Sequence, residues 1–315
     1  MQALTESDEP NSESVMNRLK PTIVQHLIPA WLAVLTLQLA STGTALAQAF
    51  TSDGLVGHYT VERASTPIAI DGVLGEFAWA QAVQINHFDR ILAPYNQVLH
   101  PTRARMLWDD AHFYFAFACE DEDVWAIYQR EDDELWEEEV VEVFIDPDGD
   151  GRDYLELEVN PLNTVVDLAI QQLTPTWAVD IDWDIAGLRT AVRVEGTVND
   201  SLSLDKGWTA EIAIPWDAMV GRIGGGGRPD PGDTWRLNLY RIERTAGRQA
   251  MYRIRSLREQ IAELSPDSEE SVQLREQLTQ LSTHYDDQTE YTAWSETHQR
   301  GFHHPQRFGV VQFAE

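Results

Sequence analysis

The chain has 315 residues, of which 23 are lysine or arginine and 52 are aspartate or glutamate, so its formal net charge is −29 at pH 7. This length fits one large β domain or two domains of ordinary size. The excess of carboxylates argues against nucleic acid or an anionic membrane surface as a partner, because both bind to positively charged faces. Neutral and cationic ligands remain possible partners.

The N-terminal residues have the composition of an export signal. Arg18 and Lys20 precede the apolar run LIPAWLAVLTLQLA, and small residues follow it up to Ala47. A basic start, an apolar centre and a small-residue end are typical of a secretory signal peptide. We therefore predict a signal peptide and leader over residues 1–48, with cleavage near Ala47. The product is expected to be secreted, periplasmic or held at the cell surface.

Two alternatives concern this N-terminal segment. Translation from Met16 would shorten the acidic leader. The second alternative is that the segment is a membrane anchor. However, its apolar run is shorter than the roughly 20 residues that a membrane span requires. No stable membrane insertion is therefore expected.

Cys119 is the only cysteine in the sequence, so no intrachain disulfide can form. An oxidising compartment would otherwise favour disulfides. Stability there must come from packing or from bound ions.

From Tyr59 onward, the sequence alternates between polar residues and Val, Ile, Phe, Tyr or Trp, with Gly, Pro and Asp between the runs. ARMLWDD and HFYFAFACED read as a hairpin that turns at Asp109 and Asp110, and GWTAEIAIPW and DTWRLNLYRIER are further alternating runs. Period-two alternation broken by turn residues is typical of strands in a sandwich or a barrel. We predict an all-β domain over residues 49–315.

Residues 251–282 interrupt this alternation with apolar residues at helical spacing. The residues concerned are Leu257, Ile261 and Leu264, and then Leu274, Leu278 and Leu281. We predict a helical hairpin inserted into a loop, with Ser265 and Pro266 as the N-cap and first residue of its second helix. The insert is expected to be a packing flap or a binding site for a partner protein.

The stretch LWEEEVVEVFIDPDGDGRDYLELEVNP predicts two strands with an apolar face and a polar face. An even-to-even register places Glu142 opposite Glu158 and Val140 opposite Asn160. Opposed carboxylates repel each other, so this face requires a cation, an arginine or the hydroxyl groups of a ligand. A solvated outer face is the alternative.

The turn DPDGDGRD between these strands carries four carboxylates, Asp146, Asp148, Asp150 and Asp153. The first three match the start of an EF-hand loop, but Leu157 stands where the bidentate glutamate would be. A full EF-hand is therefore rejected. A structural Ca²⁺ site and an ordinary Asp-rich turn both remain open.

A pair of catalytic acids is a further alternative for the polar face. Carboxylates on neighbouring strands can reach the roughly 5 to 5.5 Å separation of a retaining glycosidase. However, a general acid needs surroundings that raise its pKa, and nothing in the sequence distinguishes one glutamate of this row. We therefore expect no catalytic residue here.

Five motifs together resemble family 9 carbohydrate-binding modules. In chain order they are IAIDGVLGEFAWAQA, the long acidic stretch above continued by LNTVVDL, GWTAEIAIPW, GDTWRLNLYRIER and AWSETHQRGFHHPQRFGVVQF. The resemblance implies an antiparallel β-sandwich of the immunoglobulin-like or jelly-roll type, often with bound calcium. In such modules two tryptophans hold the end of a glucan or xylan chain.

Carried over by motif, the two clamp tryptophans correspond to Trp136 and Trp294, and the acid on the strand corresponds to Glu142. Glu158 faces Glu142. We also predict, from their location alone, that Asn160, Arg241 and Arg244 bind the hydroxyl groups of the sugar. Many relatives continue the second tryptophan with SPQG, whereas this chain has SETH. The chain therefore departs from the family pattern next to Trp294.

The resemblance implies a secreted, non-catalytic protein that binds a polysaccharide or oligosaccharide in carbohydrate catabolism. A glycoside hydrolase that uses the acidic row is the first alternative. A haem-binding electron-transfer domain is the second, because related sandwiches hold b-type haem through Met and His ligands. Its candidate ligands are Met106, His112, His303 and His304.

Overall fold

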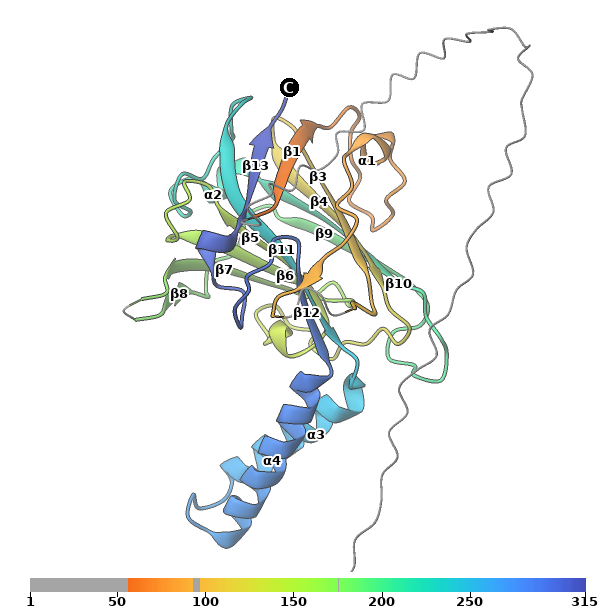
Figure 1. The fold of residues 1–315 in the computed structure, drawn as a ribbon, viewed down its shortest axis with the longest axis vertical. Coiled ribbons are helices and arrows are strands. Elements are labelled where there is room, and N and C mark those ends of the chain that lie inside the picture. The colour runs from red at the N-terminus through yellow and green to blue at the C-terminus, as the bar shows by residue number, and fades with distance from the viewer. Residues whose placement is uncertain (1–55, 93–96, 175) are drawn as a thin grey trace, which may run out of the picture. The chain divides into compact units, whose positions relative to one another are not determined.

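Alternating apolar residues form thirteen strands in the part of the chain that the structure describes, residues 56–92, 97–174 and 176–315 of a computed structural model. The strands are β1 (His58–Arg63), β2 (Asp89–Arg90), β3 (Thr102–Trp108), β4 (His112–Glu120), β5 (Val140–Asp146), β6 (Tyr154–Val159), β7 (Val165–Gln172), β8 (Ala178–Asp180), β9 (Arg189–Glu195), β10 (Gly207–Pro215), β11 (Thr234–Arg244), β12 (Thr289–Ala293) and β13 (Gly309–Phe313). The helices are α1 (Phe77–Gln81), α2 (Trp216–Met219), α3 (Gly247–Ala262) and α4 (Glu269–Asp287), with 3₁₀ turns η1 (Leu135–Glu137) and η2 (Pro305–Arg307). The domain is mostly β-sheet with few helices, as predicted (Figure 1).

The strands form one curled sheet in the order β8-β7-β6-β5-β11-β13-β1-β3-β4-β10-β9, with β12 and β2 attached beside β11. β1 joins its two halves, because His58–Val61 pair with β13 and Glu62 and Arg63 pair with β3. The inner side chains of both halves meet in one buried cluster that includes Val143 and Leu157 from one half and Phe115 and Ile212 from the other. Each such side chain contributes about 1.5–3 kcal/mol by its burial.

The prediction of a purely antiparallel sheet is wrong at β1, which runs parallel to both of its neighbours. All other strand pairs are antiparallel. Parallel neighbours need a long crossover connection, and residues 64–101 between β1 and β3 supply one. The alternation of side chains is the same in both kinds of pair, so the sequence pattern did not distinguish them.

The acidic hairpin has the predicted register. Glu142 on β5 lies opposite Glu158 on β6, and Val143 lies opposite Leu157. Because Val143 and Leu157 face the core, Glu142 and Glu158 lie together on the outer face of the sheet. This outer face carries the pocket described below.

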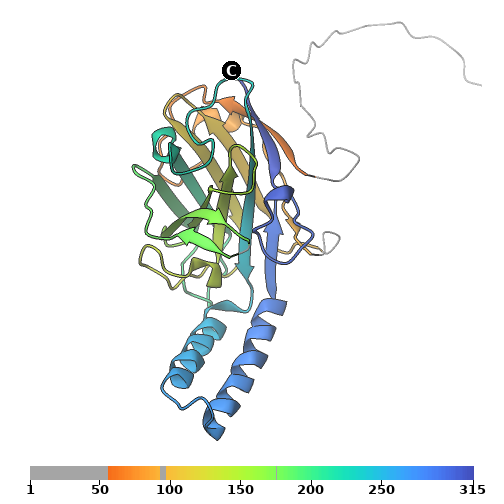
Figure 2. The same cartoon turned by 90° about the vertical axis from the view of Figure 1, so that its left-hand side faces the viewer.

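Between β11 and β12 the chain forms α3 and α4, which lie side by side in both views (Figures 1 and 2). Met251, Ile254 and Tyr285 are buried and join the apolar cluster on the outer face of the sheet. α4 begins at Glu269 with Ser268 as its N-cap, since the Ser268 hydroxyl accepts a hydrogen bond from the Ser271 N–H at 3.1 Å. The predicted cap at Ser265 is wrong, because Ser265 instead closes a turn by accepting the Ser268 N–H at 3.0 Å.

The predicted signal peptide and leader, residues 1–48, lie outside the described residues. Within the described residues, no helix has the length and apolar character needed to cross a membrane.

Candidate functional site

A pocket of about 970 Å³ lies on the outer face of the sheet. Its floor is formed by Glu142 and Phe144 of β5 and by Glu156 and Glu158 of β6. These residues alternate with core residues along the same strands, so the core and the pocket occupy opposite faces of one hairpin. The pocket is large enough for a small organic ligand.

Two half-exposed tryptophans line this pocket. Trp136 of η1 is 43% exposed, and Trp177 between β7 and β8 is 50% exposed. The ring of Trp177 stands edge-on to the His303 ring, with centroids 4.5 Å apart. A large indole left half-exposed beside a polar floor is a ready contact for a ligand with an apolar face.

The backbone of Trp136 is fixed by neighbours that also line the pocket or support it. Its carbonyl oxygen accepts a hydrogen bond from Arg244 Nη2 at 2.6 Å. The carbonyl of the next residue, Glu137, accepts one from the Tyr285 hydroxyl of α4 at 2.8 Å. The position of Trp136 therefore depends on β11 and on α4.

The three carboxyl groups of the floor are crowded and buried. One oxygen each of Glu142, Glu156 and Glu158 lies within 4.8 Å of the others, and each residue is at most 5% exposed. Glu142 Oε1, Glu156 Oε2 and Glu158 Oε2 accept no hydrogen bond from any described residue. These oxygens are buried beneath the pocket floor, and His303 Nε2 lies 3.7 Å from Glu156 Oε2.

Burial and mutual repulsion change how these groups titrate. Burial, and then the charge of Glu156, raise the pKa of Glu142 well above its usual value, although Arg244 opposes the shift. Burial, and then the charges of Glu142 and Glu156, raise the pKa of Glu158 in the same way. Burial raises the pKa of Glu156 to about 8. At neutral pH Glu156 therefore keeps its proton, and a protonated carboxyl group can donate as well as accept hydrogen bonds.

These shifts predict that the protein becomes less stable as the pH rises from 5 to 8. The unfolded chain releases these protons near pH 4.5, whereas folded Glu156 keeps its proton to about pH 8. The folded state therefore binds more protons across this window, and its free energy of unfolding falls as the pH rises. We expect Glu156→Gln to reduce this slope by on the order of 1 kcal/mol per pH unit.

Urea unfolding at pH 5, 6, 7 and 8 measures this slope. Glu195→Gln removes an exposed carboxylate of β9 and serves as the control. We expect its free energy of unfolding to change with pH as steeply as that of the unmodified protein. An unchanged slope in Glu156→Gln would show that this carboxyl group is ionised in the folded protein.

Asn160 is not in the pocket. It is fully buried, and its Nδ2 donates to the Tyr128 carbonyl at 3.0 Å and to Glu138 Oε1 at 2.6 Å. Its Oδ1 accepts the N–H groups of Leu162 and Thr164. All of its polar groups are used to hold the end of β6, so the structure gives it a role in the fold.

Arg241 is also absent from the pocket lining. Alternate residues of a strand face the same side, so Arg241 lies on the same side of β11 as Leu237 and Leu239, which is the core side of the sheet. Its guanidinium lies 3.1 Å from Asp121, also pairs with Glu243, and donates to the Glu120 carbonyl. Arg244 lies on the opposite side of β11 and lines the pocket.

Trp294 packs in the core instead of lining the pocket. Only 6% of it is exposed, and its ring meets Tyr59 edge-on at 6.3 Å. Gly57 and Gly309 leave room for it, since a Cβ atom at either glycine would lie within 3.0 Å of the indole. The predicted pair of Trp136 and Trp294 is therefore not brought together, and Trp177 is the second tryptophan of the pocket.

This packing predicts that Gly309→Ala destabilises the protein. The added Cβ would lie 2.5 Å from Trp294 Cζ3, so the indole or β13 must move. We expect the free energy of unfolding to fall by about 1–3 kcal/mol, the usual cost of overpacking a core. Gly75→Ala is the control, because its nearest neighbour would lie at 3.6 Å. Equal stability of the two variants in urea unfolding would show that Trp294 is free to leave the core.

The turn between β5 and β6 brings together three of the four predicted metal ligands. One oxygen each of Asp146, Asp148 and Asp150 lies within 4.8 Å of the others, whereas Asp153 is not part of this group. Asp146 also accepts the N–H groups of Gly149 and Gly151, and burial raises its pKa to about 6. The three carboxylates are a donor set that suits Ca²⁺, and the backbone hydrogen bonds are those of an ordinary Asp turn.

The predicted haem ligands do not meet in this pocket. Met106 is fully buried in the core between the two halves of the sheet, whereas His303 lines the pocket on the outer face. His303 is also engaged, since its Nδ1 lies 2.7 Å from the Tyr154 hydroxyl. Of the nominated haem ligands, Met106 and His303 therefore lie on opposite faces of the sheet.

A β domain whose sheet face carries a pocket with aromatic walls and a polar floor has the features of a ligand-binding module. Residues 70–315 match the family described as carbohydrate family 9 binding domain-like, and the chain belongs to this family. The resemblance predicted from the five motifs is thereby confirmed. No curated protein matches the chain.

Three solved structures are similar to this chain. A proposed carbohydrate-binding protein from Bacteroides uniformis is 14% identical, with a TM-score of 0.53 over 81% of this chain and 98% of its own. A family 9 carbohydrate-binding module from Caldicellulosiruptor kristjanssonii in complex with cellotriose is 14% identical, with a TM-score of 0.46 over 82% of this chain and 93% of its own. The same module in complex with glucose is 13% identical, with a TM-score of 0.46 over 81% of this chain and 95% of its own. At 14% identity, the likeness to the Bacteroides uniformis protein concerns the fold alone.

Proposed function

We propose that the protein binds the end of a polysaccharide or an oligosaccharide of the glucan or xylan type in the pocket on the outer face of the sheet. The observation that carries this proposal is the pair of half-exposed tryptophans, Trp136 and Trp177, beside a floor of three carboxyl groups. In a family of carbohydrate-binding domains, these groups match the two kinds of surface that a sugar presents.

A pyranose ring has an apolar C–H face and a rim of hydroxyl groups. The apolar face stacks on an aromatic ring, and the hydroxyls need donors and acceptors. Trp136 and Trp177 offer the first kind of contact, and Glu142, Glu156 and Glu158 offer the second. The aromatic clamp in this proposal therefore consists of Trp136 and Trp177, in place of Trp136 and Trp294.

Charged residues at the rim add further hydrogen-bonding groups. Arg90 and Arg300 line the pocket, and Asp286 and Asp287 reach it from α4. The helices between β11 and β12 thus contribute to the sugar site in this proposal. A protein partner at these helices, expected as an alternative from the sequence, has no contact or charge pattern in its support.

Titration calorimetry with cellotriose, xylotriose and maltotriose tests the proposal. A disaccharide has about 23 heavy atoms, and at roughly 0.3 kcal/mol per atom its Kd is on the order of 10 μM. We expect at least one of these sugars to bind with an affinity of this order and a stoichiometry of one. Absence of binding to all three would contradict the proposed function.

Binding without hydrolysis is favoured by the state of the three glutamates. A retaining hydrolase needs one ionised nucleophile beside one protonated acid, whereas burial raises the pKa of Glu142, Glu156 and Glu158 alike. We expect Glu142→Gln to weaken sugar retention, and the unmodified protein to release no reducing ends from xylan or glucan. Release that persists in highly purified protein and disappears in Glu142→Gln would establish a hydrolase.

The proposal also includes export, a sandwich architecture and calcium. Residues 1–48 are removed as a signal peptide and leader, and the mature protein works outside the cytoplasm as an antiparallel β-sandwich apart from β1. Asp146, Asp148 and Asp150 hold a structural Ca²⁺ ion, which their oxygen donors suit. Mass spectrometry of the exported protein measures the first residue, and a chain that starts well before residue 48 would contradict the predicted cleavage.

A further inference from the structure

The pocket on the outer face of the sheet has an apolar wall beside its polar floor. The wall consists of residues on β7 and on or next to the edge strand β8, namely Val166, Leu168, Trp177, Val179 and Ile181. The floor adjoins this wall, because Leu168 lies opposite Glu156 and Val166 lies opposite Glu158. The boundary between the apolar and the polar lining therefore runs between β7 and β6.

Strand alternation produces this wall. On β7 every second residue from Val166 lies on the outer side, and Val179 of β8 pairs with one of them, Ile170. Asp180 instead pairs with Ala169, which belongs to the core cluster between the two halves of the sheet. The charged residue of β8 is thereby directed away from the pocket, and the side that faces the pocket is aliphatic.

Part of the wall is open to solvent. Ile181 is 51% exposed, whereas Val166 and Leu168 are at most 9% exposed. Apolar side chains that stay exposed at a pocket mark a place where an apolar group binds. The pocket volume of about 970 Å³ is also near the upper end of the range of about 300–1,000 Å³ for small-molecule sites. A second group can therefore lie on the wall beside a bound sugar.

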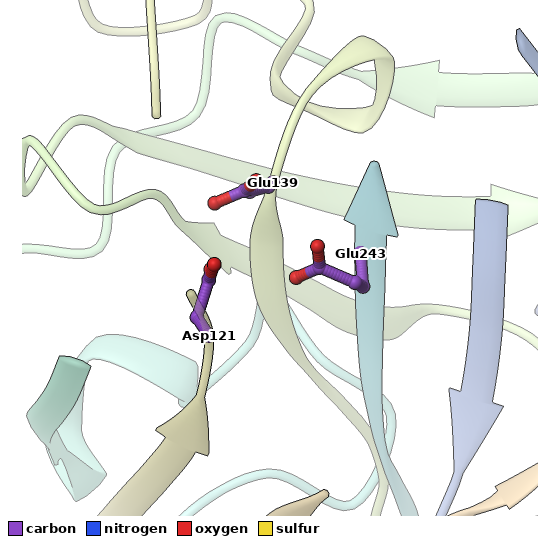
Figure 3. A group of neighbouring side chains, drawn as sticks. All are labelled: Asp121, Glu139 and Glu243. Carbon is purple, nitrogen blue, oxygen red and sulfur yellow. The ribbon is translucent and has the colours of Figure 1, made fainter. Parts of the chain in front are cut away.

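The other buried carboxyl groups of the domain do not make this wall polar. Asp121, Glu139 and Glu243 point toward one common gap (Figure 3), and none of them lines the pocket. The buried carboxyl groups that line the pocket belong to β5 and β6. The lining therefore has a hydrogen-bonding side and an apolar side.

We propose that the sugar chain bound in this pocket carries an aryl group, which packs on the wall of β7 and β8 while the sugar lies over the carboxyl floor. This inference rests on the proposed function, since it places the sugar in the same pocket. A simple sugar has little apolar surface beyond its C–H faces, and Trp136 and Trp177 already match those. The remaining aliphatic wall matches a ligand that has an apolar part of its own.

An aromatic ring fits this wall better than other apolar substituents. An acetyl group is too small to cover five side chains, and an alkyl chain loses more conformational freedom on binding than a rigid ring does. Trp177, which is half exposed beside the wall, also offers a second ring an edge or face contact. The ring can be joined to the sugar as an aryl glycoside or as an aryl ester.

Titration calorimetry with matched pairs of ligands tests the inference. The first pair is the phenyl and the methyl β-glycoside of the disaccharide that binds best, and the second is a benzoyl and an acetyl ester on the same hydroxyl of that disaccharide. We expect the aryl member of at least one pair to bind about tenfold more tightly, because its ring buries apolar surface on the wall. The pair with the larger ratio distinguishes a glycoside from an ester.

Ile181→Thr is the test variant, since threonine keeps a β-branched side chain but puts a hydroxyl group on the wall. We expect the ratio between the aryl ligand and its matched partner to fall below about threefold. Leu204→Thr is the control, because Leu204 is 84% exposed and does not line the pocket. It should keep the ratio of the unmodified protein. Val179→Thr repeats the test if Ile181→Thr does not fold.

The outcomes separate this inference from the proposed function. Equal affinities within both pairs, with the unsubstituted disaccharide still bound, would overturn the inference and leave the proposed function standing. Absence of binding to every ligand would contradict the proposed function as well. A preference for the aryl ligand that persists undiminished in Ile181→Thr and in Val179→Thr would show that the ring binds elsewhere, and would overturn its assignment to this wall.

Discussion

Replacement of Trp136 by alanine is expected to weaken sugar binding by about 10- to 100-fold. Removing an indole from one face of a bound ring loses about 1.5–3 kcal/mol of burial and stacking, and each 1.4 kcal/mol corresponds to tenfold in Kd. Because Trp136 is 43% exposed, its loss should change the free energy of unfolding by less than about 1 kcal/mol. Calorimetric titration and urea unfolding measure the two effects separately.

Phe77→Ala is the matched control for this variant. Phe77 is an exposed aromatic residue of α1 and does not line the pocket. Its replacement should leave the affinity for sugar unchanged. If Phe77→Ala and Trp136→Ala bound the sugar with equal affinity, Trp136 would not be a ligand contact.

Replacement of Arg241 by methionine is expected to lower the free energy of unfolding by about 3–5 kcal/mol. Methionine keeps much of the side-chain volume but removes the charge that Asp121 and Glu243 face at the end of the core. Breaking a buried ion pair from one side leaves an uncompensated charge, which costs about this much. This effect is far larger than that expected from an exposed pair.

Arg103→Met provides the comparison. Arg103 pairs with Glu120 at 2.6 Å, but both side chains are about half exposed. Such a surface pair contributes about 0–1 kcal/mol. Urea unfolding of both variants in the same buffer checks the difference. A loss below about 1 kcal/mol in Arg241→Met would show that the buried carboxyl groups are neutral without it.

The sequence predicts the pocket floor because strand alternation is a local property. Once Val143 and Leu157 face the core, Glu142 and Glu158 must share the other face, and Glu156 follows by the same rule. The same rule also places Arg241 with Leu237 and Leu239 on the core side. Its nomination as a sugar contact relied on proximity in the sequence, whereas the alternation along β11 places it on the core side.

The tryptophans show what alternation cannot predict. Trp294 directly follows β12 and Trp177 lies between β7 and β8, so neither stands within a strand whose alternation fixes its side. The burial of Trp294 depends on Gly57 and Gly309, which are distant in the sequence. The one local signal for Trp177 is a large indole in a turn-rich segment, TPTW, where a core residue is not expected.

The helices between β11 and β12 follow from their own spacing of apolar residues, and their ends depend on individual hydrogen bonds. A helix was expected to start after Ser265, yet Ser268 caps it through the Ser271 N–H. Ser265 and Ser268 are both acceptable caps, so the choice depends on the turn that precedes the helix.

The most direct test of the sugar site is a titration of the double variant Trp136→Ala/Trp177→Ala with the oligosaccharide that the unmodified protein binds best. We predict that binding weakens at least 100-fold, while the Tm of the variant stays within a few degrees of the unmodified protein. An affinity equal to that of the unmodified protein would show that the sugar binds elsewhere on the domain.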